Sequence, residues 1–319
     1  MPTCAAWPLN SVCMRNKYLA YIRDVRRYSD RTLAIYAEVL DEFVRFCEGC
    51  EDFQATMTVN SLRAYEVYLM DKRKLSARTV GQHLSVLSGF CRFLIKEGVL
   101  QGNPVHLVRR PKVEKRLPVF YKEKSMEEYF ERTKGDPEFG TYKQKLNRLI
   151  ISMLASCGLR RAELVSLNVG SVDFSRQVLR VRGKGDKVRE IPLIPSLCEE
   201  ISLYLKAVSS LTDDAYDPDA PLLRTPGGSR LYPVFVDRVV KAELSGVPDI
   251  TVRRSPHVLR HTLATELLSD GADLNSIKEL LGHSSLAATQ VYTHNSVERL
   301  QKVYTNAHPR AKNGGKNGD

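Results

Sequence analysis

The 319-residue sequence lacks long apolar runs, a visible secretory leader and any internal repeat. No stretch approaches the roughly 18 consecutive apolar residues of a membrane span. Residues 1–10 show no basic segment followed by an apolar one, which is the pattern of a signal peptide. We therefore expect a cytoplasmic protein without a membrane partner. Hydrophobic residues make up 43% and charged residues 27% of the chain, which excludes a mainly disordered or fibrous protein and suits about two globular domains.

Metal-binding patterns are also scarce. The seven cysteines are scattered and odd in number, which is typical of reduced intracellular thiols. Cys47 and Cys50 form a single C-x-x-C pair, but a zinc site needs two further ligands and none lies nearby. His257 and His261 are four residues apart, yet position 258 is a valine, so the H-E-x-x-H pattern of zinc hydrolases is missing. The sequence predicts neither a metal ion nor another cofactor.

Positive charge is in excess and unevenly placed. Lysine and arginine number 48 against 37 aspartate and glutamate residues, a net charge of +11 that favours a polyanionic partner. The stretch 103–118 is rich in basic residues and holds three prolines, which block helices. We interpret it as a basic linker between domains at 13–102 and 119–311, with a disordered tail at 312–319. Its basic residues either lie along a DNA backbone or belong to a solvated hinge; they include Arg109, Arg110 and Lys112.

The region before the linker has the pattern of a small helical bundle. Apolar residues recur at helical spacing over four segments, 19–25, 33–47, 59–69 and 80–94. Ser29 or Asp30 can cap the second of these helices, and Ser76 can cap the last. Three residues in the first turns are candidates to reach DNA phosphates or base edges, with ordinary solvated helix ends as the alternative: Arg31, Arg78 and Thr79.

The region after the linker mixes helices with a hairpin. Residues 146–154 predict a buried helix that ends at Gly158. Residues 178–182 and 188–191 alternate as strands around the turn sequence GKGD at 183–186. A proline after Ser255 opens a further helix, and Gly282 closes another. The predicted fold class is therefore mainly α, with a small antiparallel β hairpin or sheet in the second domain.

Five short segments of the second domain could together break a phosphodiester without metal. They are GLRRAEL at 158–164, the turn with Lys184, HVLRH at 257–261, LGH at 281–283 and VYTH at 291–294. Metal-free cleavage needs positive charge on the nonbridging oxygens, and two arginines, Arg160 and Arg260, could clamp both. A tyrosine nucleophile, with a pKa near 10, needs help from that clamp or from a base such as His257. A lysine on the hairpin could protonate the departing oxygen.

In this order the segments resemble the tyrosine recombinase (phage-type integrase) family, most closely its Xer-type enzymes. The resemblance extends from about Arg15 to Ala311, where the late sequence AHPRA also matches. It implies a two-domain, C-shaped clamp around double-stranded DNA with specific recombination sites. It also implies a homo- or hetero-tetramer on DNA, in which the segment 297–304 docks on a neighbouring protomer, with a partner recombinase or accessory activator.

The resemblance also implies a role for each matching residue. Tyr292 would attack phosphorus to give a 3′-phosphotyrosyl link and, later, a Holliday junction. The other implied roles are phosphate binding by Arg160 and Arg260, general acid catalysis by Lys184, proton transfer by His257, hydrogen bonding to phosphate by His283 and orientation of Arg160 by Glu163. His261 and His294 match no catalytic position, and Arg161 either faces solvent or DNA.

Alternative functions share part of this pattern. A DNA-binding architectural factor could keep the fold without the chemistry, although such a relative would usually have lost one member of the site. A type IB-like topoisomerase cleaves and reseals one strand, but the AHPRA tail argues against it. Among recombinases, chromosome dimer resolution by a nucleoid-associated enzyme and mobile-element integration, excision or inversion are both open.

Overall fold

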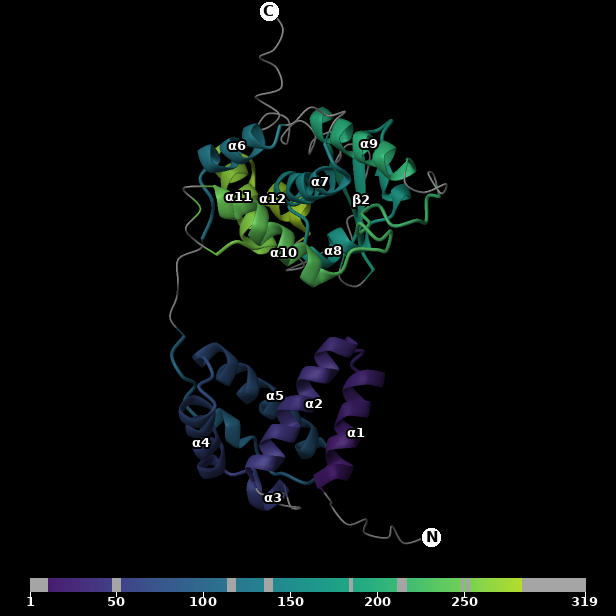
Figure 1. The fold of residues 1–319 in the computed structure, drawn as a ribbon. Coiled ribbons are helices and arrows are strands. Elements are labelled where there is room, and N and C mark those ends of the chain that lie inside the picture. Colours follow the sequence, from purple (N-terminus) through teal and green to yellow (C-terminus); the bar gives the residue numbers. More distant parts are fainter. Residues whose placement is uncertain are drawn as a thin grey trace, which may run out of the picture. The chain divides into compact units, whose positions relative to one another are not determined.

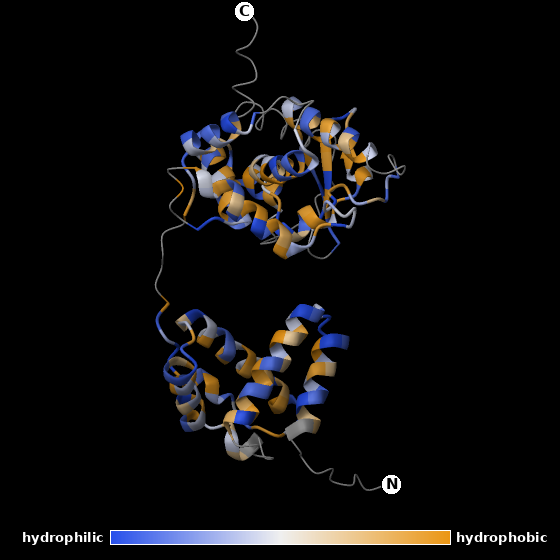
Figure 2. Ribbon diagram, in the orientation of Figure 1, coloured by the Kyte–Doolittle hydropathy of each residue, from blue (hydrophilic) through white to orange (hydrophobic). Residues whose placement is uncertain are grey.

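The computed structural model describes residues 11–47, 53–113, 119–134, 140–183, 186–210, 217–247, 250 and 253–282. The chain divides into two compact units, residues 1–116 and 117–319 (Figure 1). Each unit has its own hydrophobic core, and hydrophobic residues alternate with hydrophilic ones along the helices of both (Figure 2). Among the described residues, no helix combines the length and hydropathy needed to cross a bilayer.

The amino-terminal unit is helical throughout its described part. Its elements are α1 (Ser11–Asp24), α2 (Asp30–Phe46), α3 (Phe53–Thr56), α4 (Val59–Val67), the π-helix η1 (Tyr68–Lys72), α5 (Ala77–Lys96) and the 3-10 helix η2 (Pro104–Leu107). The predicted caps are confirmed, because the Ser29 and Ser76 side chains accept hydrogen bonds from the first turns of α2 and α5. The first predicted helix was placed too late: α1 begins at Ser11 and ends before Val25, which is exposed.

The predicted start of the linker, at residue 103, was too early in the chain. Asn103 caps η2 and donates from its side-chain amide to the Ser88 carbonyl. Val105 and Val108 are buried in the amino-terminal core. Because these two valines are buried, the amino-terminal unit continues at least to Val108. The prolines and charges around them made this stretch resemble a linker. Residues 114–118 lie outside the described part of the chain.

The second unit is built around one buried helix. Its elements are α6 (Glu123–Arg132), α7 (Tyr142–Cys157), α8 (Arg161–Ser166), the 3-10 helix η3 (Val169–Ser171), β1 (Val172–Asp173), β2 (Val178–Arg182), β3 (Val188–Pro192), α9 (Pro195–Ser209), α10 (Pro233–Glu243), the 3-10 helix η4 (Leu244–Gly246), α11 (Pro256–Ser269) and α12 (Leu274–Leu281). The central helix α7 packs against α9, α10 and α11, and Figure 1 shows it in the middle of the unit.

A small antiparallel sheet completes this unit. The strand order is β1-β2-β3, and the register pairs Val178 with Pro192 and Arg182 with Val188. The hairpin was predicted, whereas β1 was not, because two residues are too short for an alternating pattern. The mainly helical fold with a small antiparallel sheet is therefore confirmed. Since β2 contacts α8 and β3 contacts α12, the sheet meets both segments that lead into the expected site.

Candidate active site

The first candidate arginine follows a sharp reversal of the chain. Helix α7 ends at Gly158, whose φ of +57° lies in the left-handed region that glycine tolerates best. Two residues later Arg160 stands at the N-cap of α8, where its backbone N–H donates to Oε2 of Glu163 at 2.8 Å. Its guanidinium donates to Oε1 of the same carboxylate at 2.6 Å. Glu163 therefore holds Arg160 by backbone and side chain together.

The second candidate arginine reaches the same place from α11. Arg260 is 7% exposed, and its two terminal nitrogens donate to the carbonyls of Gly158, at 2.6 Å, and Leu281. Burial, and next the positive charge of Arg160, lower the pKa of Arg260 to about 10. Arg260 still carries its proton at neutral pH, so the positive charges of Arg160 and Arg260 lie close together. Such a pair of charges favours an anion of the size of a phosphate.

Both arginines contact the end of α12. Arg160 donates to the Gly282 carbonyl at 2.8 Å, beside the Leu281 carbonyl that Arg260 contacts. Gly282 caps α12 with a φ of +64°. These carbonyls belong to the partially negative end of the helix, which favours neighbouring cations. The structure thus brings together the two arginines that the sequence places in separate segments, directly before His283 in the chain.

His257 lies one turn before Arg260 on α11 and is exposed. Desolvation lowers its pKa, and the positive charges of Arg161, His261, Arg260 and Arg253 lower it further. The imidazole is therefore neutral at pH 7 and able to accept a proton. Arg161, whose direction the sequence left open, makes an ion pair with Asp237 of α10.

Sequence reasoning missed one buried residue of this cluster. Arg189 on β3 is 5% exposed and pairs with both oxygens of Glu163, at 3.0 and 2.8 Å. Its Nε donates to the Leu280 carbonyl at 3.0 Å. Burial alone would raise the pKa of Glu163, but the hydrogen bonds and charge of Arg189, with those of Arg160, outweigh it and hold that pKa below its ordinary value. The signal was the strand period, since Arg189 shares the buried face of β3 with Ile191.

Three candidates lie outside the described residues: Lys184, His283 and Tyr292. The described residues end directly before Lys184, at Gly183, and directly before His283, at Gly282. Gly183 donates its N–H to the Lys187 carbonyl at 2.8 Å and so closes the base of the hairpin. The position of the predicted nucleophile therefore stays a prediction, while the base of the lysine turn and the end of α12 are fixed.

The candidate DNA-binding residues occupy the amino-terminal unit and its end. Arg31 and Arg78 are exposed in the first turns of α2 and α5, and Thr79 bonds the capping hydroxyl of Ser76 at 2.9 Å. Three candidate basic residues after η2 are also exposed: Arg109, Lys112, and Arg110, which donates to the Ser85 hydroxyl at 3.1 Å. Their contact with DNA stays a prediction.

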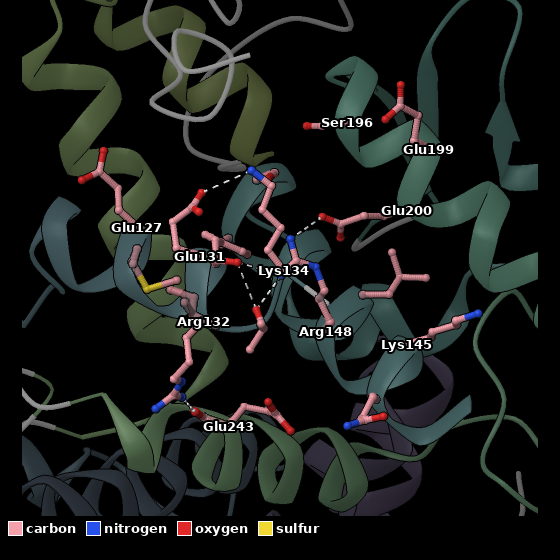
Figure 3. Close-up of a pocket in the computed structure, with 18 of the residues that line it drawn as sticks. Glu127, Glu131, Arg132, Lys134, Lys145, Arg148, Ser196, Glu199, Glu200 and Glu243 are labelled. Atoms are coloured by element: carbon pink, nitrogen blue, oxygen red, sulfur yellow. Dashed lines mark hydrogen bonds and ion pairs between the residues drawn. The ribbon is translucent and has the colours of Figure 1, made fainter. Parts of the chain in front are cut away.

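A separate groove of about 1120 Å³ opens elsewhere on the second unit, between α6, α7, α9 and α11 (Figure 3). Arg160, His257 and Arg260 are not among the residues that line it. Acidic residues outnumber basic ones in its wall. Figure 3 shows several of the carboxylates around Arg148, which pairs with Glu200 at 3.2 Å. The acidic wall residues are Glu123, Glu127, Glu131, Glu199, Glu200, Glu243 and Glu266.

Two family models match the chain. The phage integrase family matches residues 136–299, and the phage integrase N-terminal SAM-like domain matches residues 14–99. The chain belongs to the phage integrase family. Its relatives include tyrosine recombinase XerC of Bacillus pumilus, 36% identical over 307 residues that cover 92% of this chain and 95% of that protein. Tyrosine recombinase XerC of Bacillus subtilis is 35% identical over 304 residues, with the same coverage of 92% and 95%.

Solved structures of phage integrase type share the fold. The Tn1549 transposon integrase in complex with a circular intermediate DNA has a TM-score of 0.67 at 18% identity, covering 91% of this chain and 98% of that one. Lambda integrase bound to DNA has a TM-score of 0.63 at 20% identity, covering 88% and 94%. The family match and the XerC relatives show that the chain is a tyrosine-type site-specific DNA recombinase.

Proposed function

We propose that this recombinase cleaves and rejoins double-stranded DNA through a 3′-phosphotyrosyl intermediate, with Tyr292 as nucleophile. The observation that carries the proposal is the convergence of Arg160 and Arg260, from α8 and α11, on consecutive carbonyls at the end of α12. Two fixed guanidinium groups can bind both nonbridging oxygens of one phosphate. They would then stabilise the charge that grows on those oxygens in the transition state.

The cleavage step needs no cofactor or added reagent, because the bonds made and broken and the protons transferred involve only the protein and DNA. The Tyr292 oxygen bonds to phosphorus as its proton leaves to a base, for which neutral His257 is placed one turn from Arg260. The bond from phosphorus to the 5′ oxygen breaks, and Lys184 gives that oxygen a proton. His283 would hydrogen-bond the phosphate. One phosphodiester replaces another, so a 5′ hydroxyl from a second duplex can reverse the step, which leads through a Holliday junction.

The role of Lys184 can be tested with a modified leaving group. A substrate with sulfur in place of the 5′ bridging oxygen leaves as a thiolate and needs no proton. We expect Lys184→Ala to cleave ordinary DNA about 100- to 1000-fold more slowly and to recover on the sulfur substrate. Equal defects on both substrates would contradict the assignment. The neighbouring exposed Lys187→Ala is the matched control.

Strand exchange needs several protomers, and the acidic groove offers a contact between them. Its floor is apolar, with Met126, Phe130 and Leu259 among the lining residues. The segment 297–304 carries apolar residues at helical spacing, with two basic residues, Arg299 and Lys302, and one acidic residue, Glu298. This complementarity supports docking of that segment from a neighbouring copy in a tetramer on DNA. Deleting residues 297–319 should preserve binding to a single site and abolish recombination between two sites; unchanged recombination would contradict the docking.

The DNA site decides the biological role. We propose that the amino-terminal unit reads the site, with Arg31, Arg78 and Thr79 as contacts, while the residues after η2 hold the backbone and make binding sensitive to salt. Sequencing of DNA trapped on the protein separates the two roles. One recovered chromosomal site favours resolution of chromosome dimers by a cytoplasmic, nucleoid-associated enzyme, whereas sites that flank a movable segment favour integration, excision or inversion.

A further inference from the structure

We propose that Arg189 is a positioning residue for cleavage, which ties β3 to the segment of Arg160 and to the end of α12 that leads into His283. The inference rests on the proposed function and adds a residue that acts without touching DNA. Arg189 lies on the strand that follows the Lys184 turn. Arg189 lies outside the five segments that resemble the family, and its contacts alone point to a role.

The guanidinium of Arg189 donates hydrogen bonds to two different segments of the chain. Its terminal nitrogens pair with the two oxygens of Glu163, while its Nε donates to the Leu280 carbonyl. Only a planar fork with several donors can make these bonds at once, and a lysine cannot. The side chain is buried, so the bonds are sheltered from water. Arg189 therefore fixes the distance between α8, β3 and α12.

Glu163 is the shared partner through which Arg189 reaches Arg160. Oε1 accepts hydrogen bonds from the guanidinium groups of both arginines, and Oε2 accepts from Arg189 and from the Arg160 backbone. Without Arg189, each carboxylate oxygen keeps only its hydrogen bond from Arg160, and the carboxylate loses its connection to β3. The phosphate-binding arginine would then lose its fixed direction.

Two glycines bring the remaining segments against Arg189. A Cβ atom on Gly282 would lie 3.1 Å from Nη1 of Arg189 and 3.3 Å from its Cδ and Cζ atoms. A Cβ atom on Gly183 would lie 3.6 Å from the same Nη1 and 3.7 Å from Oε1 of Glu163. These glycines directly precede His283 and Lys184 in the chain. The last described residue before each of these two predicted site residues thus lies against the Arg189–Glu163 pair.

A double-variant experiment separates positioning from simple charge balance. Arg189→Met leaves Glu163 buried beside fewer cations, so it should lower stability. Combined with Glu163→Gln, the buried charge disappears and most of that stability should return. If Arg189 positions the site, single-turnover cleavage by the double variant should be about 100-fold slower than that of Glu163→Gln alone, with DNA affinity close to that of the wild type. Arg189→Lys should also cleave slowly.

The matched control is Arg180→Met on β2, an exposed arginine that pairs with Glu190 on the surface of the same sheet. It should cleave at the wild-type rate. Wild-type cleavage by Arg189→Lys, or by the stable double variant, would overturn the inference and leave the proposed function intact. A wild-type protein that forms no adduct dependent on Tyr292 would overturn both.

Discussion

Glu266 on α11 is held in an unfavourable electrostatic environment, which makes stability depend on pH in a defined way. Burial first, and then the negative charges of Glu123, Asp270 and Glu127, raise the pKa of Glu266 to about 7 from an ordinary 4.5. The folded protein therefore binds this proton more tightly than the unfolded chain. The stabilising contribution is complete below about pH 4.5 and is lost as pH rises through about 7.

The two pKa values set an upper limit on the effect. A gap of about 2.5 pH units corresponds to about 3.4 kcal/mol, at about 1.36 kcal/mol for each pH unit. Because the neighbouring carboxylates share the titration, we expect about 2 kcal/mol. Glu266→Gln removes the titration, so its stability relative to wild type should rise by that amount between about pH 5 and pH 8. Urea denaturation followed by circular dichroism at each pH measures the difference.

The control is Glu128→Gln, a substitution at an exposed position of α6. It should change the free energy of unfolding by a similar small amount at both pH values. If the stability difference between Glu266→Gln and wild type is the same at low and high pH, the pKa of Glu266 is not raised in the folded protein and the prediction is wrong.

Two further predictions concern the arginine cluster. Gly282→Ala should lower the free energy of unfolding by about 1–2 kcal/mol, because an alanine at a φ of +64° is strained and its Cβ meets Arg189 at 3.1 Å; urea denaturation at neutral pH checks this, and an unchanged midpoint would refute it. Arg260→Lys should slow single-turnover cleavage by about 100- to 1000-fold with little change in DNA affinity. The exposed His261→Gln on the same helix is its control, and equal rates for the two variants would contradict the role of Arg260.

Local signals in the sequence predicted much of the fold. Serine caps marked the starts of α2 and α5, and left-handed glycines marked the ends of α7 and α12. Turn chemistry and alternation predicted the hairpin. The end of the amino-terminal unit was misplaced because Val105 and Val108 are anchors within a proline-rich, basic stretch. Burial of isolated valines depends on tertiary contacts, which no local pattern reports.

The site was predictable where chemistry imposes a motif. Arg160, His257 and Arg260 lie in spaced segments whose order resembles that of the family, and the structure places both arginines at the end of α12. Arg189 was missed because an arginine on a short strand is ordinarily solvated. The strand period placed Arg189 on the buried face of β3, but its partner Glu163 is distant in the sequence, so the pair itself appears only in the fold.

The central claim is most directly tested by trapping the covalent intermediate. The protein is incubated with genomic DNA fragments in EDTA and then denatured, and protein bound to DNA is quantified for wild type and for Tyr292→Phe. We expect an adduct that forms without metal, is joined to a 3′ phosphate and disappears in Tyr292→Phe. An adduct of equal yield in that variant, or cleavage that requires a divalent cation, would contradict it.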